Sequence, residues 1–273
     1  MSFADLHLHT YFSDGTYSPQ QLAAAAKTAG LSCIGVVDHD TVDGLVIVAA
    51  EAEAVGIELI PGIELSAEYE NQEAHILGYL IDGASSALKG QLAILQNNRR
   101  ERIYKICRRL SGLGVALDPQ SVFALAKGAI VGRLHVARAM AAQGIVTSVA
   151  EAFQKYIGDN GPAYVLGFRF SVPEAVKLIK DCAGIPVLAH PYLLKGDEAI
   201  PRFIGYGIMG IEAYYPEHTQ GMTNFYLNLA KENNLLVTGG SDCHGSAKPE
   251  EKIGALKIPY ALVEKLKEAQ GKR

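Results

Sequence analysis

Short apolar runs alternate with helical patterns in the first third of the chain. The alternation predicts strands and helices in the order 3–8, 19–29, 33–37, 45–54 and 58–63. Ser18 before Pro19 indicates a helix start, because serine can cap a helix and proline fits its first turn, and Gly30 and Gly56 mark helix ends. Strand–helix–strand alternation at this spacing is typical of βαβ units around a parallel sheet.

The middle of the chain has a different pattern, with arginine-rich helical segments and no convincing strand. Helices are expected at 92–113, 121–126, 135–142 and 149–156. After a helix start at Ser171 the βα pattern resumes, with elements expected at 185–189, 208–213, 221–232 and 235–238. The sequence therefore predicts an α/β domain of residues 1–84 and 165–273, interrupted by a helical insertion of residues 85–164.

Composition places the chain among soluble globular proteins. It has 273 residues, of which 49% are hydrophobic and 20% charged, and this excludes disordered and fibrous classes. The four cysteines lie far apart with no CxxC pair, and no apolar run approaches the roughly 20 residues that span a bilayer. The first residues are strand-like and do not resemble a signal segment. We expect a cytoplasmic protein with no membrane contact and no stable protein partner.

Residues able to bind metals follow nearly every predicted strand. In parallel α/β proteins the loops at the carboxyl ends of strands carry the chemistry. The residues met there are His7, His9, His39, Glu64, His75, His190, Glu212, Asp242 and His244. Six of the eight histidines fall at predicted strand ends, whereas scattered surface histidines would show no such registration.

The segment Asp5-Leu6-His7-Leu8-His9 is an alternating strand that puts Asp5, His7 and His9 on one face. We expect Asp5 to support one imidazole through a hydrogen bond and not to bind metal itself. Carboxylates mixed with imidazoles suit Mn, Zn or Fe. The number of candidate ligands fits two or three divalent ions, which is typical of a hydrolytic centre.

These residues stand in motifs that resemble the PHP (polymerase and histidinol phosphatase) family. The matching segments are Asp5–Thr10, Ser13-Asp14-Gly15, Val37–Thr41, Pro61–Glu64, His75, Ala189-His190-Pro191 and Gly240–His244. The resemblance implies a distorted (β/α)7 barrel like a TIM barrel. The helical insertion between His75 and His190 resembles the branch of nucleoside 3′,5′-bisphosphate phosphatases and 5′-to-3′ exoribonucleases.

The resemblance also implies three ligand sets and a catalytic residue. The first set is His7, His9, Glu64 and Asp242; the second shares Glu64 and adds His75 and His190; the third is Asp14, His39 and His244. Asp14 stands where some relatives have a histidine. Glu64, shared by two sets, is the predicted bridging residue on which catalysis depends.

The insertion supplies candidate substrate contacts. Gly132-Arg133-Leu134-His135 opens a helix, and Arg133 with His135 is a candidate phosphate clamp, which the resemblance supports because relatives carry a similar Gly-Arg-x-His. The alternative for Arg133 is a solvated residue on the helix surface. Tyr164 is a candidate for stacking on a base, and the alternative is packing. His218 is a candidate phosphate contact or general acid, and the alternative is a solvent-exposed helix-start histidine. Where relatives continue with Pro-Lys after Val165, this chain has Arg169 as a possible replacement.

We therefore predict a metal-dependent phosphoesterase that acts on a small nucleotide. The expected substrate is a nucleoside 3′,5′-bisphosphate, with 5′-to-3′ exonuclease action on short RNA as an additional activity. The alternatives are a histidinol-phosphate phosphatase, an amidohydrolase-type C–N hydrolase, and a metal-binding regulatory module without catalysis.

Overall fold

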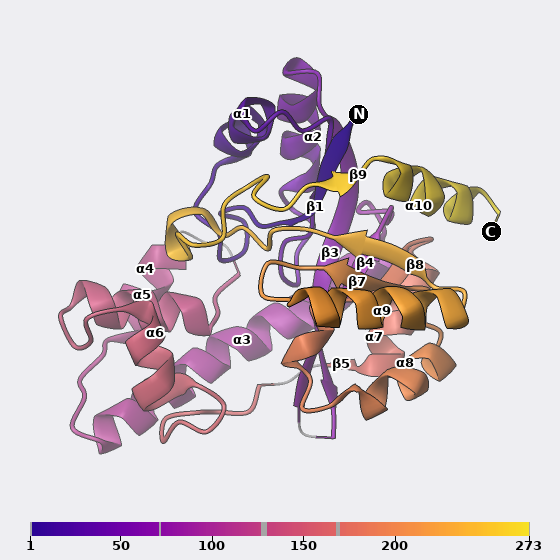
Figure 1. The fold of residues 1–273 in the computed structure, drawn as a ribbon. Helices are drawn as coiled ribbons and strands as arrows, with labels where there is room; N and C mark the ends of the chain where they lie inside the picture. The colour runs from indigo at the N-terminus through magenta and orange to yellow at the C-terminus, as the bar shows by residue number, and fades with distance from the viewer. Residues whose placement is uncertain (1, 71, 127–129, 168–169, 273) are drawn as a thin grey trace.

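A computed structural model describes residues 2–70, 72–126, 130–167 and 170–272, and it shows a barrel-shaped sheet surrounded by helices (Figure 1). The barrel strands, in their order around the sheet, are β1 (Phe3–Leu8), β2 (Cys33–Val36), β3 (Glu58–Tyr69), β4 (Gln72–Tyr79), β6 (Ile185–Leu188), β7 (Gly210–Tyr214) and β8 (Leu236–Gly239). A bridge between Leu8 and Cys243, with a 3.1 Å hydrogen bond from His9 N to Cys243 O, joins the last strand's extension to β1. The predicted barrel fold is confirmed.

The distortion of the barrel lies in β4, which runs antiparallel to both of its neighbours while the other barrel pairs are parallel. The antiparallel pairing of β3 with β4 extends from Gly62 and Tyr79 to Tyr69 and Gln72. The prediction that Glu64 and His75 stand at carboxyl ends of strands is wrong. Glu64 lies in the middle of β3, which continues to Tyr69, and His75 lies near the start of β4. Because β4 runs backwards, its start reaches the same rim as the ends of the parallel strands.

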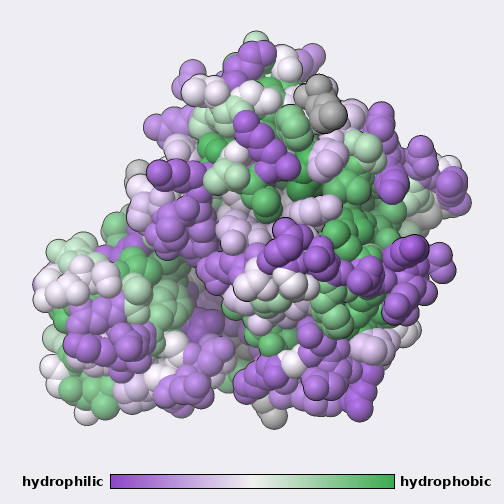
Figure 2. Space-filling view, viewed as in Figure 1, coloured by the Kyte–Doolittle hydropathy of each residue, from purple (hydrophilic) through white to green (hydrophobic). Residues whose placement is uncertain are grey.

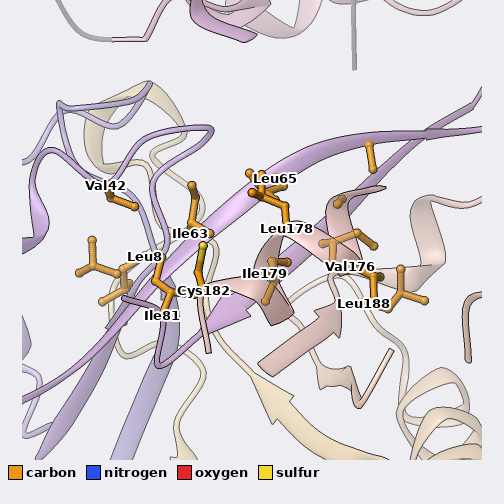
Figure 3. Close-up of a cluster of buried hydrophobic side chains, with 14 of the residues drawn as sticks. Leu8, Val42, Ile63, Leu65, Ile81, Val176, Leu178, Ile179, Cys182 and Leu188 are labelled. Carbon is orange, nitrogen blue, oxygen red and sulfur yellow. The ribbon is translucent and has the colours of Figure 1, made fainter. Parts of the chain in front are cut away.

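Helices cover the outside of the sheet. They are α1 (Pro19–Thr28), α2 (Leu45–Ala54), α7 (Val172–Asp181), α8 (Ile200–Tyr206), α9 (Gln220–Glu232) and α10 (Ala261–Gly271). The predicted cap is present, since Ser18 Oγ accepts a 3.1 Å hydrogen bond from Gln21 N. Strand residues such as Ile63, Leu65 and Leu188 pack against Val176 and Ile179 of α7 (Figure 3). This packing removes the apolar face of each helix from water and fixes the strands that carry the site.

Short elements complete the α/β part. They are β5 (Phe170–Ser171), which pairs with β3, β9 (Ile258–Pro259), which pairs with β1, and the 3₁₀ turns η2 (Pro191–Leu193), η3 (Asp197–Ala199) and η4 (Gly245–Ala247). Of the helices that the structure describes, none combines the length and the apolar character that crossing a bilayer requires.

The middle of the chain forms a helical lobe beside the barrel, as Figure 1 shows. Its elements are α3 (Ser86–Gly112), α4 (Pro119–Ala126), α5 (Arg133–Ala142), α6 (Val149–Ala152) and the π-helical turn η1 (Phe153–Ile157). The helix α3 begins six residues before the predicted start at 92, and its two halves belong to different cores. Leu88 and Leu92 pack in the barrel core, whereas Ile103 and Leu110 pack in a separate core of the lobe. The domain boundaries at 84 and 165 stay a prediction.

Candidate metal centre

His7, His9, Glu64 and Asp242 meet at the rim of the barrel, and their donor atoms lie within 4.8 Å of one another. Glu64 Oε2 is 3.2 Å from Nε2 of His7 and 3.2 Å from Nε2 of His9. Asp242 Oδ1 is 3.3 Å and 3.0 Å from the same two nitrogens. The two-residue period of β1 places both imidazoles on one side, as the sequence predicts.

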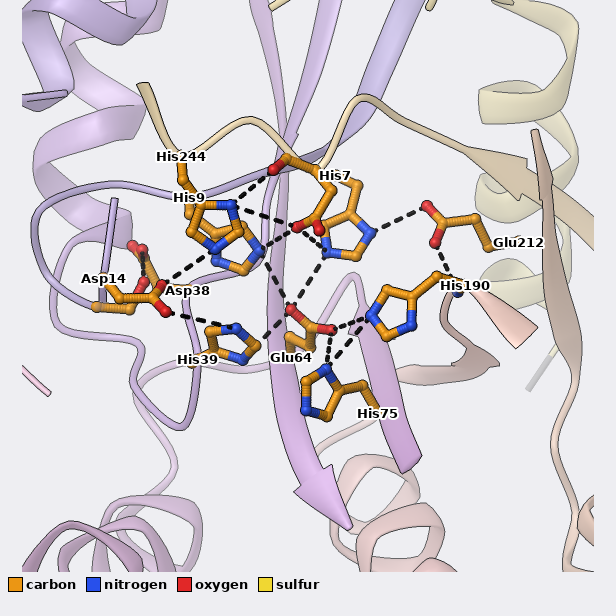
Figure 4. A network of polar contacts seen from close by, with 12 residues as sticks. His7, His9, Asp14, Asp38, His39, Glu64, His75, His190, Glu212 and His244 are labelled. Carbon is orange, nitrogen blue, oxygen red and sulfur yellow. Dashed lines mark hydrogen bonds and ion pairs between the residues drawn. The ribbon is translucent and has the colours of Figure 1, made fainter. Parts of the chain in front are cut away.

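Glu64 turns its second oxygen toward another pair of histidines. Oε1 lies 2.8 Å from His75 Nδ1 and 3.0 Å from His190 Nε2, and these two nitrogens are 3.3 Å apart. Figure 4 shows the side chain of Glu64 between the His7–His9 pair on one side and the His75–His190 pair on the other. Glu64 is therefore common to two groups of donors.

A third group contains Asp14, His39 and His244 together with His9. His244 Nε2 lies 3.2 Å from Asp14 Oδ1, and His39 Nε2 lies 4.0 Å from Asp14 Oδ2. A bridge between His39 and Glu64 extends the parallel pairing of β2 with β3, and it brings His39 Nδ1 within 3.3 Å of Glu64 Oε2. The structure thus brings together all nine residues predicted from the sequence as metal ligands.

The charged side chains of the cluster and their burial shift one another's pKa values. Burial alone would raise the pKa of Glu64, but positive charge on His39, His75 and His7 holds it well below its usual range. Burial disfavours protonated His75 and His244, yet neighbouring carboxylates raise the pKa of both to about 10. Burial dominates at His39 and lowers its pKa to about 3. The protein groups alone thus hold protons that a bound cation would displace.

Glu212 supports the cluster from behind. Its Oε1 accepts from His7 Nδ1 at 3.0 Å, and its Oε2 accepts from the backbone N–H of His190 at 2.8 Å. The prediction that Asp5 supports an imidazole is wrong: Asp5 instead accepts backbone N–H groups of Ser241 and Gly254 at 2.9 and 3.0 Å. The position of Glu212 at a strand end indicates that it lies near the site. Its partners, His7 and His190, cannot be predicted from that position, because they depend on how the strands pack together.

The donor set fits divalent metal ions. Both ring nitrogens of His9 are buried and without a hydrogen bond, although Nε2 lies 3.0 Å from Asp242 Oδ1. Within the described part of the chain, the ion-pair partners of the fully buried Glu64 are all histidines. A buried imidazole such as that of His9, which faces a carboxylate without a hydrogen bond, is the kind of side chain that a metal ion binds. A buried carboxylate also needs positive charge nearby.

A cavity of about 950 Å³ opens above the cluster. The barrel contributes seven of the predicted ligands to its lining, and the helical lobe contributes Arg133, Leu134 and Phe153. Figure 2 shows the surface recessed between the lobe at lower left and the rest of the molecule. The cavity therefore joins a metal-binding floor to a wall from the insertion.

Comparison with known proteins agrees with this architecture. A family model described as the PHP domain matches residues 5–162. The chain is 32% identical over 245 residues to a 5′-3′ exoribonuclease of Haemophilus influenzae, and the match covers 88% of this chain and 89% of that protein. The chain belongs to the PHP domain family.

Other PHP relatives extend over nearly the whole chain. A 3′,5′-nucleoside bisphosphate phosphatase of Chromobacterium violaceum is 30% identical over 261 residues, which is 93% of this chain and 91% of that protein. A solved structure of a proposed metal-dependent phosphoesterase from Bifidobacterium adolescentis superposes with a TM-score of 0.90 and 29% identity, covering 96% of this chain and 94% of that one. This PHP protein is a metal-dependent phosphoesterase.

Of the two residues predicted to clamp phosphate, only Arg133 lines the PHP cavity. Its guanidinium forms ion pairs with Glu73 at 2.7 Å and with Asp159 at 2.6 Å. His135 is buried and caps its own helix, since its Nδ1 accepts from Gly132 N at 3.2 Å. Burial lowers the pKa of His135 to about 4. The structure therefore does not bring His135 to the cavity.

Tyr164 and His218 also lie outside the cavity lining. The ring of Tyr164 faces the guanidinium groups of Arg102 and Arg133, 5.7 and 5.4 Å from its centroid. Nδ1 of His218 donates to Ala213 O at 3.0 Å, because the residue folds back onto its own strand, and tyrosine rings surround it. The geometry does not support the prediction that His218 acts as a general acid.

The cavity is also lined by residues that are not among the candidate site residues predicted from the sequence. Arg99 of α3 lines it and donates from Nε to Asp40 Oδ2 at 2.7 Å. Phe153 and Lys248 also line it. Their spacing in the sequence carried no signal, because both reach the site only through the folding of the insertion and of the loop after β8. Arg169, the suggested replacement for a missing basic residue, lies outside the described residues.

Proposed function

We propose that this enzyme removes a phosphate from a nucleoside 3′,5′-bisphosphate. The observation that carries the proposal is the position of Arg133, which stands on the wall of the cavity above the donor groups that share Glu64. A substrate with two phosphates can place one at the metal groups and the other near a guanidinium, which binds phosphate in a bidentate manner. The similarity to a bisphosphate phosphatase supports the same substrate class.

Two or three ions of Mn, Zn or Fe would bind in this proposal. The first would take His7, His9, Glu64 and Asp242; the second Glu64, His75 and His190; the third Asp14, His39 and His244. Bound divalent cations supply Lewis acidity to the phosphoryl group and to the attacking water. The protein groups do the positioning: Glu64 holds two donor groups in register, and Glu212 fixes the ring of His7.

The walls of the cavity suit a nucleoside. Phe153 of η1 and Leu193 of η2 both line it, and Leu193 is 55% exposed. The aromatic ring of Phe153 can stack on the face of a base, and the apolar side chain of Leu193 can pack against its edge. We assign the contact with the base to Phe153 and not to Tyr164, whose face is covered by guanidinium groups.

Cleavage of short RNA from its 5′ end is a second candidate activity. A smaller cavity of about 360 Å³ adjoins the main one and shares Arg133 and Phe153 with it. It continues past Asp159 and Leu194, and this supports room for a further nucleotide. The similarity to a 5′-3′ exoribonuclease points the same way.

A substrate panel tests the proposal. Protein reconstituted separately with Mn²⁺, Zn²⁺ or Fe²⁺ is incubated with adenosine 3′,5′-bisphosphate, AMP, a short RNA with a 5′ phosphate, and histidinol phosphate. We expect the highest kcat/KM on the bisphosphate, and we expect no activity on any substrate after the metal has been removed with a chelator. Faster turnover of histidinol phosphate would favour the rival phosphatase, and no release of phosphate or nucleotide from any nucleotide would refute the proposal.

A further inference from the structure

Lys248 follows η4 in the loop after β8 and faces the cavity. Its Nζ lies 3.1 Å from Asp242 Oδ2 and 3.3 Å from Glu251 Oε2. The loop is fixed at its start, because Thr16 N donates to His244 O at 3.1 Å and Thr16 Oγ1 accepts from Ser246 N at 2.8 Å. The ammonium group therefore stands at a defined place beside the donor groups.

Lys248 stands beside a fourth group of possible metal donors. Asp242, His244 and Glu251 place their donor atoms within 4.8 Å of one another, as the other groups do. Glu251 Oε2 lies 3.4 Å from His244 Nδ1. Among the described residues, however, the carboxylates of Asp14 and Glu64 ion-pair with histidines alone, whereas this fourth group ion-pairs with a lysine.

The two oxygens of Asp242 have separate partners. Oδ1 faces His9 Nε2 at 3.0 Å and His7 Nε2 at 3.3 Å. Oδ2 accepts from Tyr215 Oη at 2.9 Å and from Lys248 Nζ at 3.1 Å. Two donors on Oδ2 fix the plane of the carboxylate, so that only Oδ1 is directed at the His7–His9 group.

We propose that Lys248 is a tethered cation that occupies the fourth group and keeps a metal ion out of it. This inference rests on the proposed metal sites. A divalent ion between Asp242 and Glu251 would meet a positive charge within a few ångströms, and like charges at that range repel each other.

Metal counting tests this role without reference to turnover. Wild-type protein and Lys248→Met, which keeps the length of the side chain and removes its charge, are dialysed to equilibrium against Mn²⁺, and bound metal is measured by mass spectrometry. We expect Lys248→Met to bind one equivalent more per chain than wild type. Lys248→Arg, which keeps the charge, should match wild type, and Lys248→Gln should gain the same equivalent as Lys248→Met.

The double variant Lys248→Met/Glu251→Gln locates the added ion, and it should lose the extra equivalent. Equal metal content in wild type, Lys248→Met and Lys248→Gln would overturn the inference, and so would an extra equivalent that persists in the double variant. Wild-type protein that takes up no Mn²⁺, Zn²⁺ or Fe²⁺ would instead refute the proposed metal sites, and the two failures are therefore distinguishable.

Discussion

Glu212 and His7 form a buried pair in which the carboxylate Oε1 lies 3.0 Å from the imidazole Nδ1. The bond directs Nε2 of His7 toward the metal groups. Replacing Glu212 by alanine also removes the acceptor for the backbone N–H of His190. We expect Glu212→Ala to weaken metal binding by roughly 10- to 100-fold, the usual effect of losing such a partner. Titration with Mn²⁺ measures this affinity, and Glu232→Ala, at an exposed position, is the control. An unchanged affinity in Glu212→Ala would show that Glu212 does not support metal binding.

Glu64→Ala should reduce turnover strongly. It removes both oxygens that face the two histidine groups, and the loss of a shared ligand should cost several kcal/mol of transition-state stabilisation, roughly a thousand-fold in kcat. Glu53→Ala on the exposed side of α2 is the matched control. Phosphate release from adenosine 3′,5′-bisphosphate at saturating Mn²⁺ gives the comparison. Near-wild-type turnover by Glu64→Ala would show that Glu64 is not the bridging residue.

Arg133→Ala should discriminate between substrates. If the guanidinium binds the second phosphate, its removal lowers kcat/KM for the bisphosphate by roughly 10- to 100-fold, the value of a hydrogen bond to a charged group. A simple aryl phosphate, which lacks that group, should be affected less. Arg138→Ala on the same helix, outside the cavity lining, is the control. Equal losses on both substrates would argue against a role in recognition.

Stability should depend on pH through His135. Burial lowers its pKa to about 4, whereas an unfolded histidine titrates near 6.5, so the unfolded chain binds the proton first on acidification. The free energy of unfolding should therefore fall by about 2 kcal/mol from this residue between pH 7 and pH 5. In His135→Gln, urea unfolding at the two pH values should show a correspondingly smaller decrease. An identical decrease in both proteins would show that His135 is not buried in its neutral form.

The sequence predicts well which side chains gather at the rim of the barrel, because local rules place most of them. The two-residue period of β1 puts His7 and His9 on one face, and strand ends bring His190 and Asp242 to one rim. Such rules do not depend on which strands are neighbours. They hold as long as the barrel forms.

The remaining misses depend on partners that are distant in the sequence. Asp5 and Glu212 are equally good acidic neighbours of His7 by position, and only the packing of β7 beside the site selects Glu212. The reversed direction of β4 leaves no mark in the pattern around His75. His218 stands after a strand like the true neighbours of the cavity, but its ring turns back toward Ala213.

The helix α3 belongs to both hydrophobic cores, and Arg99 lies between its two halves. The lobe therefore cannot swing away from the barrel as a free flap without bending one continuous helix or tearing Leu92 or Ile103 from its packing. Arg99 also ties this helix to Asp40, beside the candidate ligand His39. The wall and the floor of the cavity are thus joined by one continuous helix, so a movement of one relative to the other must be paid for by unpacking α3.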